Sequence, residues 1–432
     1  MERVEFTKAM RKTHTILIPD MLPIHFKMIE RVLRDEGYQV ELLQTTGSKI
    51  AQEGLNHVHN DTCYPALLVI GQMIDALKSG KYDLDHVALA ITQTGGGCRA
   101  SNYLYLLRKA LVQAGFENIP VISLNFSKME KNSGFKLTLR LLIKLIYALI
   151  YGDMLMWIAN QCLPYETAKG TTMGVVDHWV AKLNTQFHSL RFLYISRNYK
   201  QLLTEFSMIK RSCVDKIKVG IVGEIYMKYA PLGNNNLVDF LLKENAEPVV
   251  SGVIDFGLYC LKNNQVDFSL YGIKKHVQPI AKLAISFITH CQSRMIKAIQ
   301  KEGTFRAPGT FDSLLEAGEG FINKGAKMGE GWLLTSEMVE LIHSGVQNIV
   351  CCQPFGCLPN HIVAKGMMRK IKNVYPTANI VAVDYDPGAS IINQENRLKL
   401  MLANARLNER MAHGGTAEYA DKKAHVYAYE PH

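Results

Sequence analysis

Several features common in other proteins are missing from this 432-residue chain. No stretch near 18 residues long is both apolar and free of charge, so the sequence predicts no membrane-spanning helix. The first residues are charged rather than apolar, which argues against a secretory signal. No Walker-type phosphate loop, Rossmann dinucleotide fingerprint or short-period repeat is present. Any step driven by ATP is therefore expected to need a partner chain.

Charge of one sign is also never concentrated. The net charge of +10 comes from 49 Lys and Arg against 39 Asp and Glu, and blocks of five like charges do not occur. Such a balance suits nucleic acid, membrane headgroups or an anionic small molecule. Because the basic residues are dispersed and no nucleic-acid motif is present, we expect a general surface bias, with neither nucleic acid nor membrane as partner.

Cysteine is present in an odd number, nine, in a long chain that lacks a signal-like start. This usage predicts reduced thiols in a cytoplasmic protein, where ligation or burial are their uses. Four of them lie in helix-like or ordinary apolar contexts and are expected to be buried spectators: Cys162, Cys213, Cys260 and Cys291.

The 48% hydrophobic composition is enough for a substantial core divided into two or three domains. Residues 1–126 alternate strand-like and helix-like runs, which predicts a parallel sheet covered by helices on both faces. Residues 127–215 are helix-like, and 137–158 read as a buried helix. Residues 216–411 repeat the strand and helix alternation, with a strand expected at 248–253 and a helix over 362–372. Residues 412–432 form a tail without a sustained period. The predicted class is α/β, with two doubly wound parallel-sheet (Rossmann/flavodoxin-like) domains and a helical insertion between them.

The stretch from Thr92 to Asn102 reads Thr-Gln-Thr-Gly-Gly-Gly-Cys-Arg-Ala-Ser-Asn and joins a strand-like run to a helix-like run. Its glycines, Gly95, Gly96 and Gly97, permit positive φ and close approach to a bulky group. Cys98 then falls at a helix N-terminus beside Arg99, where a thiolate is expected to be stabilised. The alternative is a tight turn with an incidental thiol.

Two further thiols occupy similar places. Cys63 precedes a helix-like run that begins near Pro65, and Cys357 follows a strand-like run and precedes another helix. Turns after parallel strands meet at one edge of a sheet, so these thiols can converge with Cys98. Cys352, at the end of the same strand, competes with Cys357, and Cys351 should face the opposite way from Cys352.

Glu224 directly follows the first strand of the second α/β region, in Gly-Glu-Ile-Tyr. Such a carboxylate suits a general acid or base, or a hydrogen bond beside a bound group. It equally suits a cap on the adjacent turn. The loop Gly329 to Leu334 is a further candidate to line the cleft, although Trp332 suits the core as well.

Motifs spread over roughly Thr13 to Asn408 together resemble the 2-hydroxyacyl-CoA dehydratase superfamily. They are closest to its activase-associated branch, which is related to benzoyl-CoA reductase subunits and double-cubane cluster proteins. The resemblance is carried by five segments: Asn60 to Ala66, Thr92 to Asn102, Gly223 to Tyr229, Gln353 to His361 and Asp384 to Ser390.

This resemblance implies an oxygen-sensitive iron–sulfur cluster, either [4Fe-4S] or a double-cubane [8Fe-9S], held by Cys63, Cys98 and Cys357. Three thiolates leave one iron free for substrate, water or a bridging sulfide, which indicates chemistry rather than simple electron storage. The implied partner is an ATP-dependent activase of the actin and sugar-kinase type, with acyl-CoA a candidate substrate and a homodimer or heterodimer a candidate assembly.

Two functions remain open at this point. In the first, the chain takes low-potential electrons from the activase for radical dehydration or reduction of an acyl-CoA or other small substrate, with Glu224 a candidate catalytic residue. In the second, it is a non-catalytic iron–sulfur component that relays electrons to, or matures, a separate dehydratase. A metal-free scaffold is a third reading, and it leaves the three-glycine turn unexplained.

Overall fold

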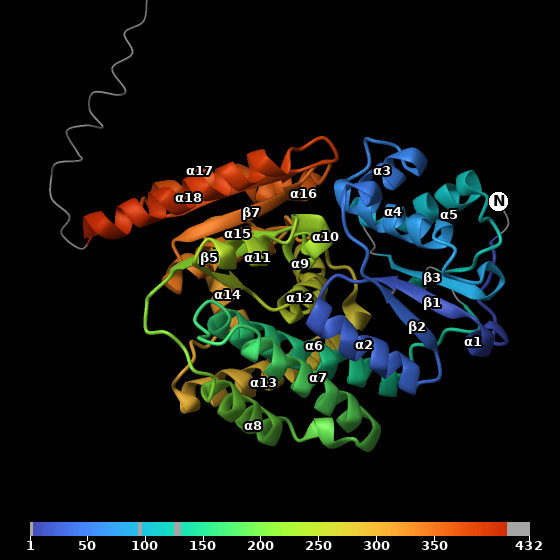
Figure 1. Cartoon of the computed structure of the whole chain (residues 1–432), viewed down its shortest axis with the longest axis horizontal. Helices are drawn as coiled ribbons and strands as arrows, with labels where there is room; N and C mark the ends of the chain where they lie inside the picture. The colour runs from blue at the N-terminus through green and yellow to red at the C-terminus, as the bar shows by residue number, and fades with distance from the viewer. Residues whose placement is uncertain (1–2, 94–96, 125–129, 131, 413–432) are drawn as a thin grey trace, which may run out of the picture.

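The computed structural model describes residues 3–93, 97–124, 130 and 132–412, and its strands form two four-stranded sheets (Figure 1). All neighbouring strands in both sheets are parallel. The strand orders are β2-β1-β3-β4 and β6-β5-β7-β8, so the two sheets share one topology. This is the order of flavodoxin-like doubly wound sheets, with helices on both faces. The fold class predicted from the sequence is confirmed.

The first half of the molecule holds the first sheet. Its elements in chain order are α1 (Met10–Thr13), β1 (Thr15–Pro19), α2 (Pro23–Asp35), β2 (Gln39–Leu43), α3 (Ser48–His57), α4 (Tyr64–Lys78), β3 (Val87–Thr92), α5 (Tyr103–Ala114) and β4 (Val121–Leu124). Five successive residues of β3 are buried, because helices cover both faces of the sheet. The near-continuous apolar run that marked this strand in the sequence follows from that double coverage.

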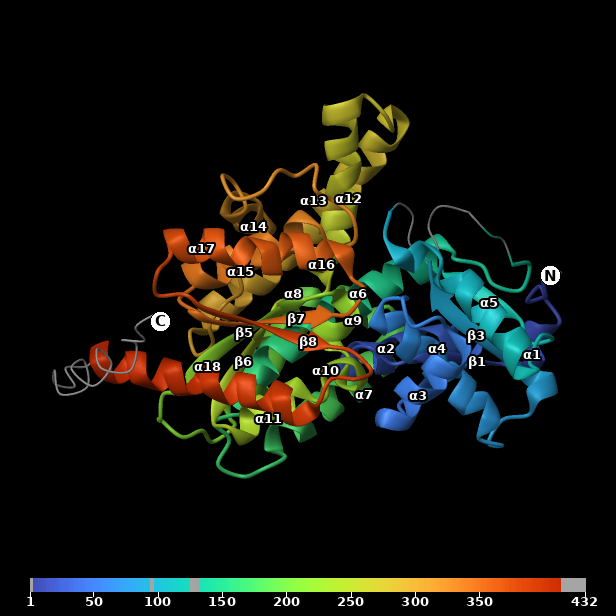
Figure 2. The ribbon, with the colours of Figure 1, turned by 90° about the horizontal axis from the view of Figure 1, so that it is seen from above.

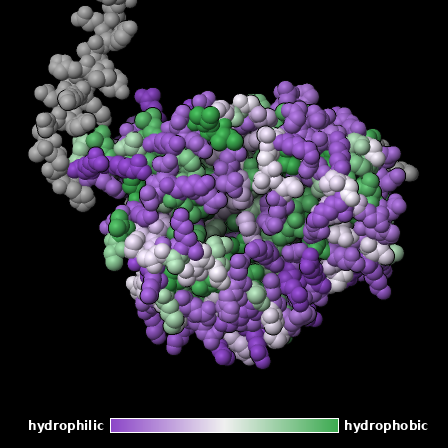
Figure 3. Space-filling model, viewed as in Figure 1, coloured by the Kyte–Doolittle hydropathy of each residue, from purple (hydrophilic) through white to green (hydrophobic). Residues whose placement is uncertain are grey.

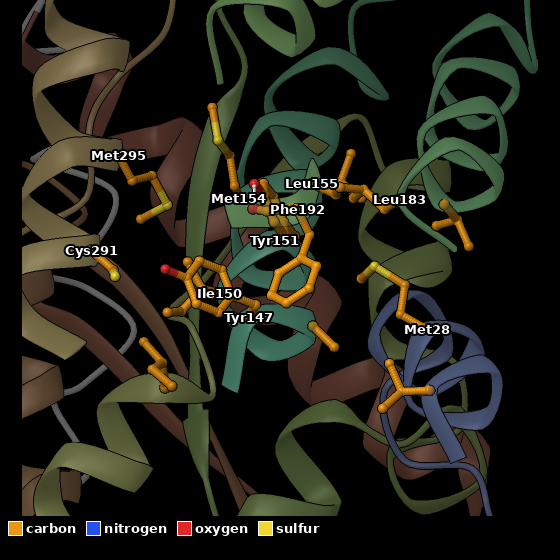
Figure 4. Close-up of a cluster of buried hydrophobic side chains, with 14 of the residues drawn as sticks. Met28, Tyr147, Ile150, Tyr151, Met154, Leu155, Leu183, Phe192, Cys291 and Met295 are labelled. Atoms are coloured by element: carbon orange, nitrogen blue, oxygen red, sulfur yellow. Dashed lines mark hydrogen bonds between the residues drawn. The ribbon is translucent and has the colours of Figure 1, made fainter. Parts of the chain in front are cut away.

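A helical middle region joins the two halves and consists of α6 (Leu139–Cys162), α7 (Thr171–Ser189) and α8 (Ile195–Ser207). The long helix α6 is apolar enough by composition to cross a membrane, but 61% of its most apolar window is buried inside the molecule. Figure 4 shows Tyr147, Tyr151 and Met154 of this helix surrounded by other buried apolar side chains. The expected buried helix in this part of the chain is confirmed.

Asp153 of α6 connects the two halves. One carboxylate oxygen accepts hydrogen bonds from His25 Nε2 of α2 at 2.8 Å and from the backbone N–H of Val253 at 2.9 Å. The other oxygen accepts from the N–H of Ile254 at 3.0 Å. All of these groups are buried or half-buried, so one side chain ties α6 to an element of each half.

The second half holds the second sheet and most of the remaining helices. Its elements are β5 (Ile217–Gly223), α9 (Ile225–Tyr229), α10 (Pro231–Asn234), α11 (Leu237–Lys243), β6 (Ala246–Val250), α12 (Ile254–Tyr271), α13 (Gln278–Glu302), α14 (Phe311–Ala317), α15 (Trp332–His343), β7 (Asn348–Pro354), α16 (Leu358–Val363), α17 (Met368–Val374), β8 (Asn379–Tyr385) and α18 (Ile391–Ala412). Helices α12 and α13 form a hairpin that projects from the body of the molecule (Figure 2).

Local chemistry explains where the second half departs from the sequence prediction. The strand expected at 248–253 lies at Ala246–Val250 and tolerates Pro248 because β6 is an edge strand. The single helix expected over 362–372 is split into α16 and α17 by a 3₁₀ turn at Lys365–Met367. The expected tail is helical up to 412, and 413–432 lie outside the described residues.

On the face seen in Figure 1, hydrophilic residues predominate and hydrophobic residues form small separate patches (Figure 3). The large apolar side chains lie mainly in three buried clusters. One cluster contains residues of both sheets, including Leu89 of β3 and Ile221 of β5, so the two halves share a core. The carboxyl ends of the strands from both halves therefore border one region.

Candidate functional site

Three cysteines each occupy the position immediately before a helix. Cys63 is the N-cap residue of α4, and Cys357 is that of α16. Cys98 precedes a short 3₁₀ helix, Arg99–Ser101, which leads into α5. All three sit where unpaired backbone N–H groups and the helix dipole favour negative charge. The sequence prediction that three thiols open three helices is confirmed.

Cys63 and Cys357 are brought together by a direct contact between the two halves. The backbone N–H of Tyr64 donates to the carbonyl oxygen of Phe355 at 3.0 Å. Between these thiols, Gly356 has φ +72°, and a Cβ there would lie 3.0 Å from Cys63 Cα. A glycine is therefore required by conformation and by space. This seam joins the loop after β7 to the start of α4.

The loop that precedes α15 contacts the turn that holds Cys98. A Cβ built on Gly329 would lie 3.9 Å from Cys98 Sγ and 3.2 Å from Pro359 Cγ, so this glycine lies between the Cys98 turn and α16. In the same loop, Met328 Sδ accepts a hydrogen bond from the N–H of Gly97 at 3.2 Å. The loop thus connects the three-glycine turn of the first half to the Cys357 helix of the second.

The glycines of that turn meet the prediction only in part. Gly95 and Gly96 lie outside the described residues. Gly97 has no positive φ, so the conformational reason expected for it is wrong. Its described constraint is space, because a Cβ would lie 3.1 Å from Met328 Sδ.

Tyr103, at the start of α5, is a site residue that the sequence reading missed. Its hydroxyl lies 2.8 Å from Cys63 Sγ, and either group can be the donor. Burial and the nearby Cys63 thiol raise the pKa of Tyr103 well above its usual value, so the hydroxyl stays protonated. Its place five residues after Cys98 was the only signal in the sequence, because a helix start does not reveal a contact with a residue forty positions earlier.

Glu224 follows β5 and caps α9. Its Oε2 accepts from the N–H of Met227 at 2.9 Å, which is the capping role considered in the sequence. The side chain also lies near the thiols, since its ionised form raises the pKa of Cys63, Cys98 and Cys357. Burial and the Glu330 carboxylate raise the pKa of Glu224 to about 8. At neutral pH this carboxyl group holds a proton.

Glu330 is the second carboxyl group of the site. It lies in the loop that the sequence marked as a possible cleft lining, although the residue itself was not singled out. Its Oε1 accepts from the N–H of Ile225 at 3.0 Å, directly after Glu224 in the chain. The side chain is buried, and burial raises the pKa of Glu330. Two buried carboxyl groups, both with a raised pKa, therefore lie close to each other and near the thiols.

The expected stabilisation of a Cys98 thiolate is wrong for the protein without a bound cation. Burial raises the pKa of Cys98 to about 11, and the ionised forms of Glu330 and Glu224 act in the same direction. A hydrogen bond from the N–H of Ala100 lowers this pKa but is outweighed by burial. The expected cation, Arg99, is exposed and donates to the carbonyl oxygen of Asp61 instead. Arg99 thereby ties the Cys98 turn to the Cys63 turn.

Cys351 and Cys352 face opposite sides of β7, as expected, and belong to different core clusters. Asn360 Nδ2 donates to the carbonyl oxygen of Cys352 at 3.1 Å, while Asn360 Oδ1 lies 3.6 Å from Cys351 Sγ. Cys352 is fully buried next to Tyr385. The charged groups that shift the pKa of Cys352 are Lys228 and Glu224. The pKa of Cys357 is raised by the nearby Cys63 as well. The geometry therefore groups Cys357 with the other two thiols.

The four cysteines set aside in the sequence differ in exposure. Cys162 and Cys291 are buried, as predicted. Cys213 and Cys260 are exposed, so the expectation of burial is wrong for both. Cys213 lies in the connection before β5, and Cys260 lies on the outer side of α12. A helix-like context indicates a helix, but it does not say which side faces solvent.

Three thiols are a donor set of the kind that an iron–sulfur cluster uses. Within the described ranges, no three His, Cys, Asp or Glu side chains are close enough to share one metal ion. A cubane presents its irons at separate corners, so thiolates that bind it do not meet at one point. Burial raises the pKa of the thiols of Cys63, Cys98 and Cys357, and a bound cationic core reverses that preference. These three residues could hold such a group.

Comparison with known proteins identifies no relative, so a functional assignment rests on the residues of the chain itself. A scan against protein-family models and a search of curated proteins gave no match. The resemblance to the dehydratase superfamily therefore enters below as a proposal, together with the fold and the grouping of the thiols.

Proposed function

We propose that this protein is an oxygen-sensitive iron–sulfur protein of the 2-hydroxyacyl-CoA dehydratase type, which receives low-potential electrons from an ATP-dependent activase. The observation that carries the proposal is the grouping of three helix-capping cysteines from two sheets. Cys63 and Cys98 come from the first half and Cys357 from the second. The segments around them also carry the family resemblance.

Cys63, Cys98 and Cys357 would hold the cluster. When bound, an iron–sulfur cluster supplies one-electron chemistry and an iron able to take a substrate oxygen. The protein's own contribution is to bury the thiols and exclude water: Cys63 and Cys357 are 5% and 7% exposed. Tyr103 orients Cys63 through its hydroxyl.

The two carboxyl groups provide the proton chemistry. Because the pKa of Glu224 is raised to about 8 by burial and by Glu330, the group carries a proton at neutral pH and can release it to a strong base. The N–H groups of Met227 and Ile225 fix one oxygen of Glu224 and of Glu330, respectively. The other oxygen of each carboxyl group is the atom that would donate or accept the proton.

A specific observation also favours the relay alternative. The cavity beside Glu330, lined by Gly223, Lys228 and Glu337 among others, has a volume of about 10 Å³. This is room for roughly one water molecule, far below the several hundred Å³ of a typical small-molecule site. A protein that relays or stores electrons needs no larger space.

Anoxic purification followed by iron and sulfide analysis tests the proposal. We expect a brown, air-labile preparation with about four irons per chain, or about eight if two cubanes are bridged. A folded anoxic preparation without iron would refute both forms of the proposal.

Assays with an activase, ATP and acyl-CoA thioesters then separate the two forms. Turnover of a thioester supports the catalytic form. Reduction of the cluster without turnover, followed by electron transfer to a separate dehydratase, supports the relay.

A further inference from the structure

The free end of the α12–α13 hairpin is an exposed surface unlike the rest of the molecule. It comprises residues 265–287, called here the hairpin end, and projects from the body (Figure 2). Large apolar side chains are exposed along it: Phe268, Leu270, Tyr271, Ile273, Ile280, Leu283 and Phe287. Ile280 and Leu283 are 71% and 74% exposed. Apolar side chains gathered in this way mark an interaction site on a folded protein.

The apolar side chains of α13 follow a helical spacing. Ile280, Leu283 and Phe287 are three and four residues apart, so they share one side of the helix over about two turns. Buried positions such as Ala281 and Ile288 face the other way and pack against the body. The exposed stripe is therefore a second apolar face that the described part of the chain leaves uncovered.

Basic residues outnumber acidic ones at the hairpin end. Residues 265–287 contain Lys274, Lys275 and Lys282 but a single acidic residue, Asp267. Asp267 is buried and is neutralised by ion pairs with Lys274 and Lys327. Lys275 and Lys282 are exposed and form no ion pair within the described residues. An incoming surface therefore meets uncompensated positive charge beside the apolar stripe.

The hairpin end also contains a groove next to these positive charges. It has a volume of about 380 Å³ and lies between α12 and α13. Phe268 and Pro279 provide apolar wall, and Lys275 and Lys282 lie at the same opening. A groove of this size accepts one or two large side chains, with anionic groups favoured at its rim.

The hairpin end also contacts the loop that approaches Cys98. A Cβ on Gly325 would lie 3.2 Å from Leu270 Cδ1, and Lys327 Nζ pairs with Asp267 and lies 5.9 Å from the ring centre of Tyr271. The next residue, Met328, binds the N–H of Gly97. A partner on the hairpin end is thus placed beside the thiol site.

We propose that the hairpin end docks an acidic protein partner, which presents apolar side chains flanked by carboxylates to the groove and to the Ile280–Leu283 stripe. The proposal does not depend on the iron–sulfur assignment. A second copy of this chain would bring Lys275 and Lys282 against like charges. An anionic membrane presents no side chain that could fill a concave groove lined by Gln265 and Gln278.

Fluorescence anisotropy with a labelled peptide tests the proposal on the full-length protein. The probe is an amphipathic helical peptide with Leu and Phe on one face and Glu on both flanks, and its twin has Lys at every Glu. We expect the Glu peptide to bind the wild type, and Lys275→Glu with Lys282→Glu to weaken it about tenfold. The same variant should gain affinity for the Lys peptide.

Two further variants make the test specific. Ile280→Ser with Leu283→Ser should weaken the Glu peptide without favouring the Lys peptide, because it removes apolar contact and leaves the charge. Lys297→Glu with Lys301→Glu is the matched control, since it makes the same charge change near the base of α13. All six side chains are exposed or solvent-facing, so circular dichroism should show unchanged folding.

Three outcomes would overturn the proposal. The first is equal binding of both peptides, or no binding of the Glu peptide. The second is preferential binding of the wild type to phosphatidylglycerol vesicles over both peptides and over phosphatidylcholine vesicles. The third is a dimer in analytical ultracentrifugation that Ile280→Ser with Leu283→Ser dissociates. Anoxic iron content is independent of all three results, so failure here leaves the proposed function untouched.

Discussion

The two halves of the molecule have the same strand order but present different chemistry at their strand ends. In each half a carboxylate follows the first strand directly: Asp20 after β1 and Glu224 after β5. In each half a cysteine follows the third strand and precedes a helix: Cys98 after β3 and Cys357 after β7. Equivalent topology thus places equivalent side chains at one shared region.

The halves differ before the helix that leads into the third strand. In the first half that helix is α4, and the residue before it is Cys63. In the second half it is α15, whose N-cap residue is Gly331, with Glu330 one position earlier. The position of the Cys63 thiol is therefore occupied by a glycine in the second half, and the carboxyl group of Glu330 lies next to it in the chain. The comparison teaches why the site has three thiols rather than four: the fold offers four such positions, and the fourth holds Gly331.

Removal of a grouped thiol is expected to have the largest effect. Cys63→Ala, Cys98→Ala and Cys357→Ala should each lose most of the iron of the anoxic protein, because each removes an anchor from a different element. Iron and sulfide analysis with electron paramagnetic resonance after reduction measures this loss.

The remaining cysteines provide the controls. Cys213→Ala, at an exposed position, should keep full iron, and Cys352→Ala should keep iron with a changed spectrum. If Cys352→Ala lost its iron while Cys357→Ala kept it, the third ligand would be Cys352 of β7 and not Cys357.

The seam between the halves gives the next largest effect. Gly356→Ala should destabilise the protein by about 3 kcal/mol or more, because positive φ and the contact with Cys63 both resist a Cβ. Gly345→Ala is matched in φ at +86° but has open space, and should cost about 1–2 kcal/mol. Urea unfolding measures both. Equal costs would mean that the seam yields without strain.

A substitution that gives the second half a second thiol, as in the first half, should change the thiol site but not abolish it. Glu330→Cys places a fourth thiol one residue before the position that corresponds to Cys63, and we expect iron to be retained with a changed resonance spectrum. Glu330→Ser is the control, because it also loses the acceptor for Ile225 N–H, at a cost of about 1–3 kcal/mol, without adding a thiol. Identical spectra for the two variants would contradict the proposed correspondence.

The last prediction concerns protons. Burial raises the pKa of Glu224 to about 8, whereas the unfolded chain ionises near the usual value of about 4.3. Between these values the native state binds more protons, so the free energy of unfolding falls as pH rises. Glu224→Gln should flatten this fall by up to about 1.4 kcal/mol per pH unit, measured by urea unfolding of iron-free protein from pH 5 to 8.

The counterpart in the first half serves as comparison. Burial also raises the pKa of Asp20, so Asp20→Asn should flatten the same curve from a lower starting pH. A Glu224→Gln curve parallel to the wild type would mean that Glu224 is ionised in the native state.

Much of the fold was predictable because it rests on local patterns. The strands Thr15–Pro19 and Val121–Leu124 are recognisable in the sequence because buried parallel strands are short apolar runs between turns. The position of Cys63 before a helix followed from Pro65 at the first helical turn, and Pro359 occupies the same place after Cys357.

The rest of the site depends on contacts between distant parts of the chain. Tyr103 reaches Cys63, and Met328 reaches Gly97 over 231 residues, and neither pairing leaves a local pattern. The raised pKa of Cys98 depends on burial by other elements, which outweighs the helix terminus that the sequence displays. Such features follow from tertiary packing alone.

The carboxylate of Asp153 has a kinetic consequence for the site. Because it binds His25 of the first half and Val253 and Ile254 of the second, it holds elements of both halves together. If a redox group binds at the thiols as proposed, a rigid surrounding would let it change its charge with little rearrangement of the nearby dipoles. Its reorganisation energy would then be low, and electrons would enter and leave quickly even when the driving force is small.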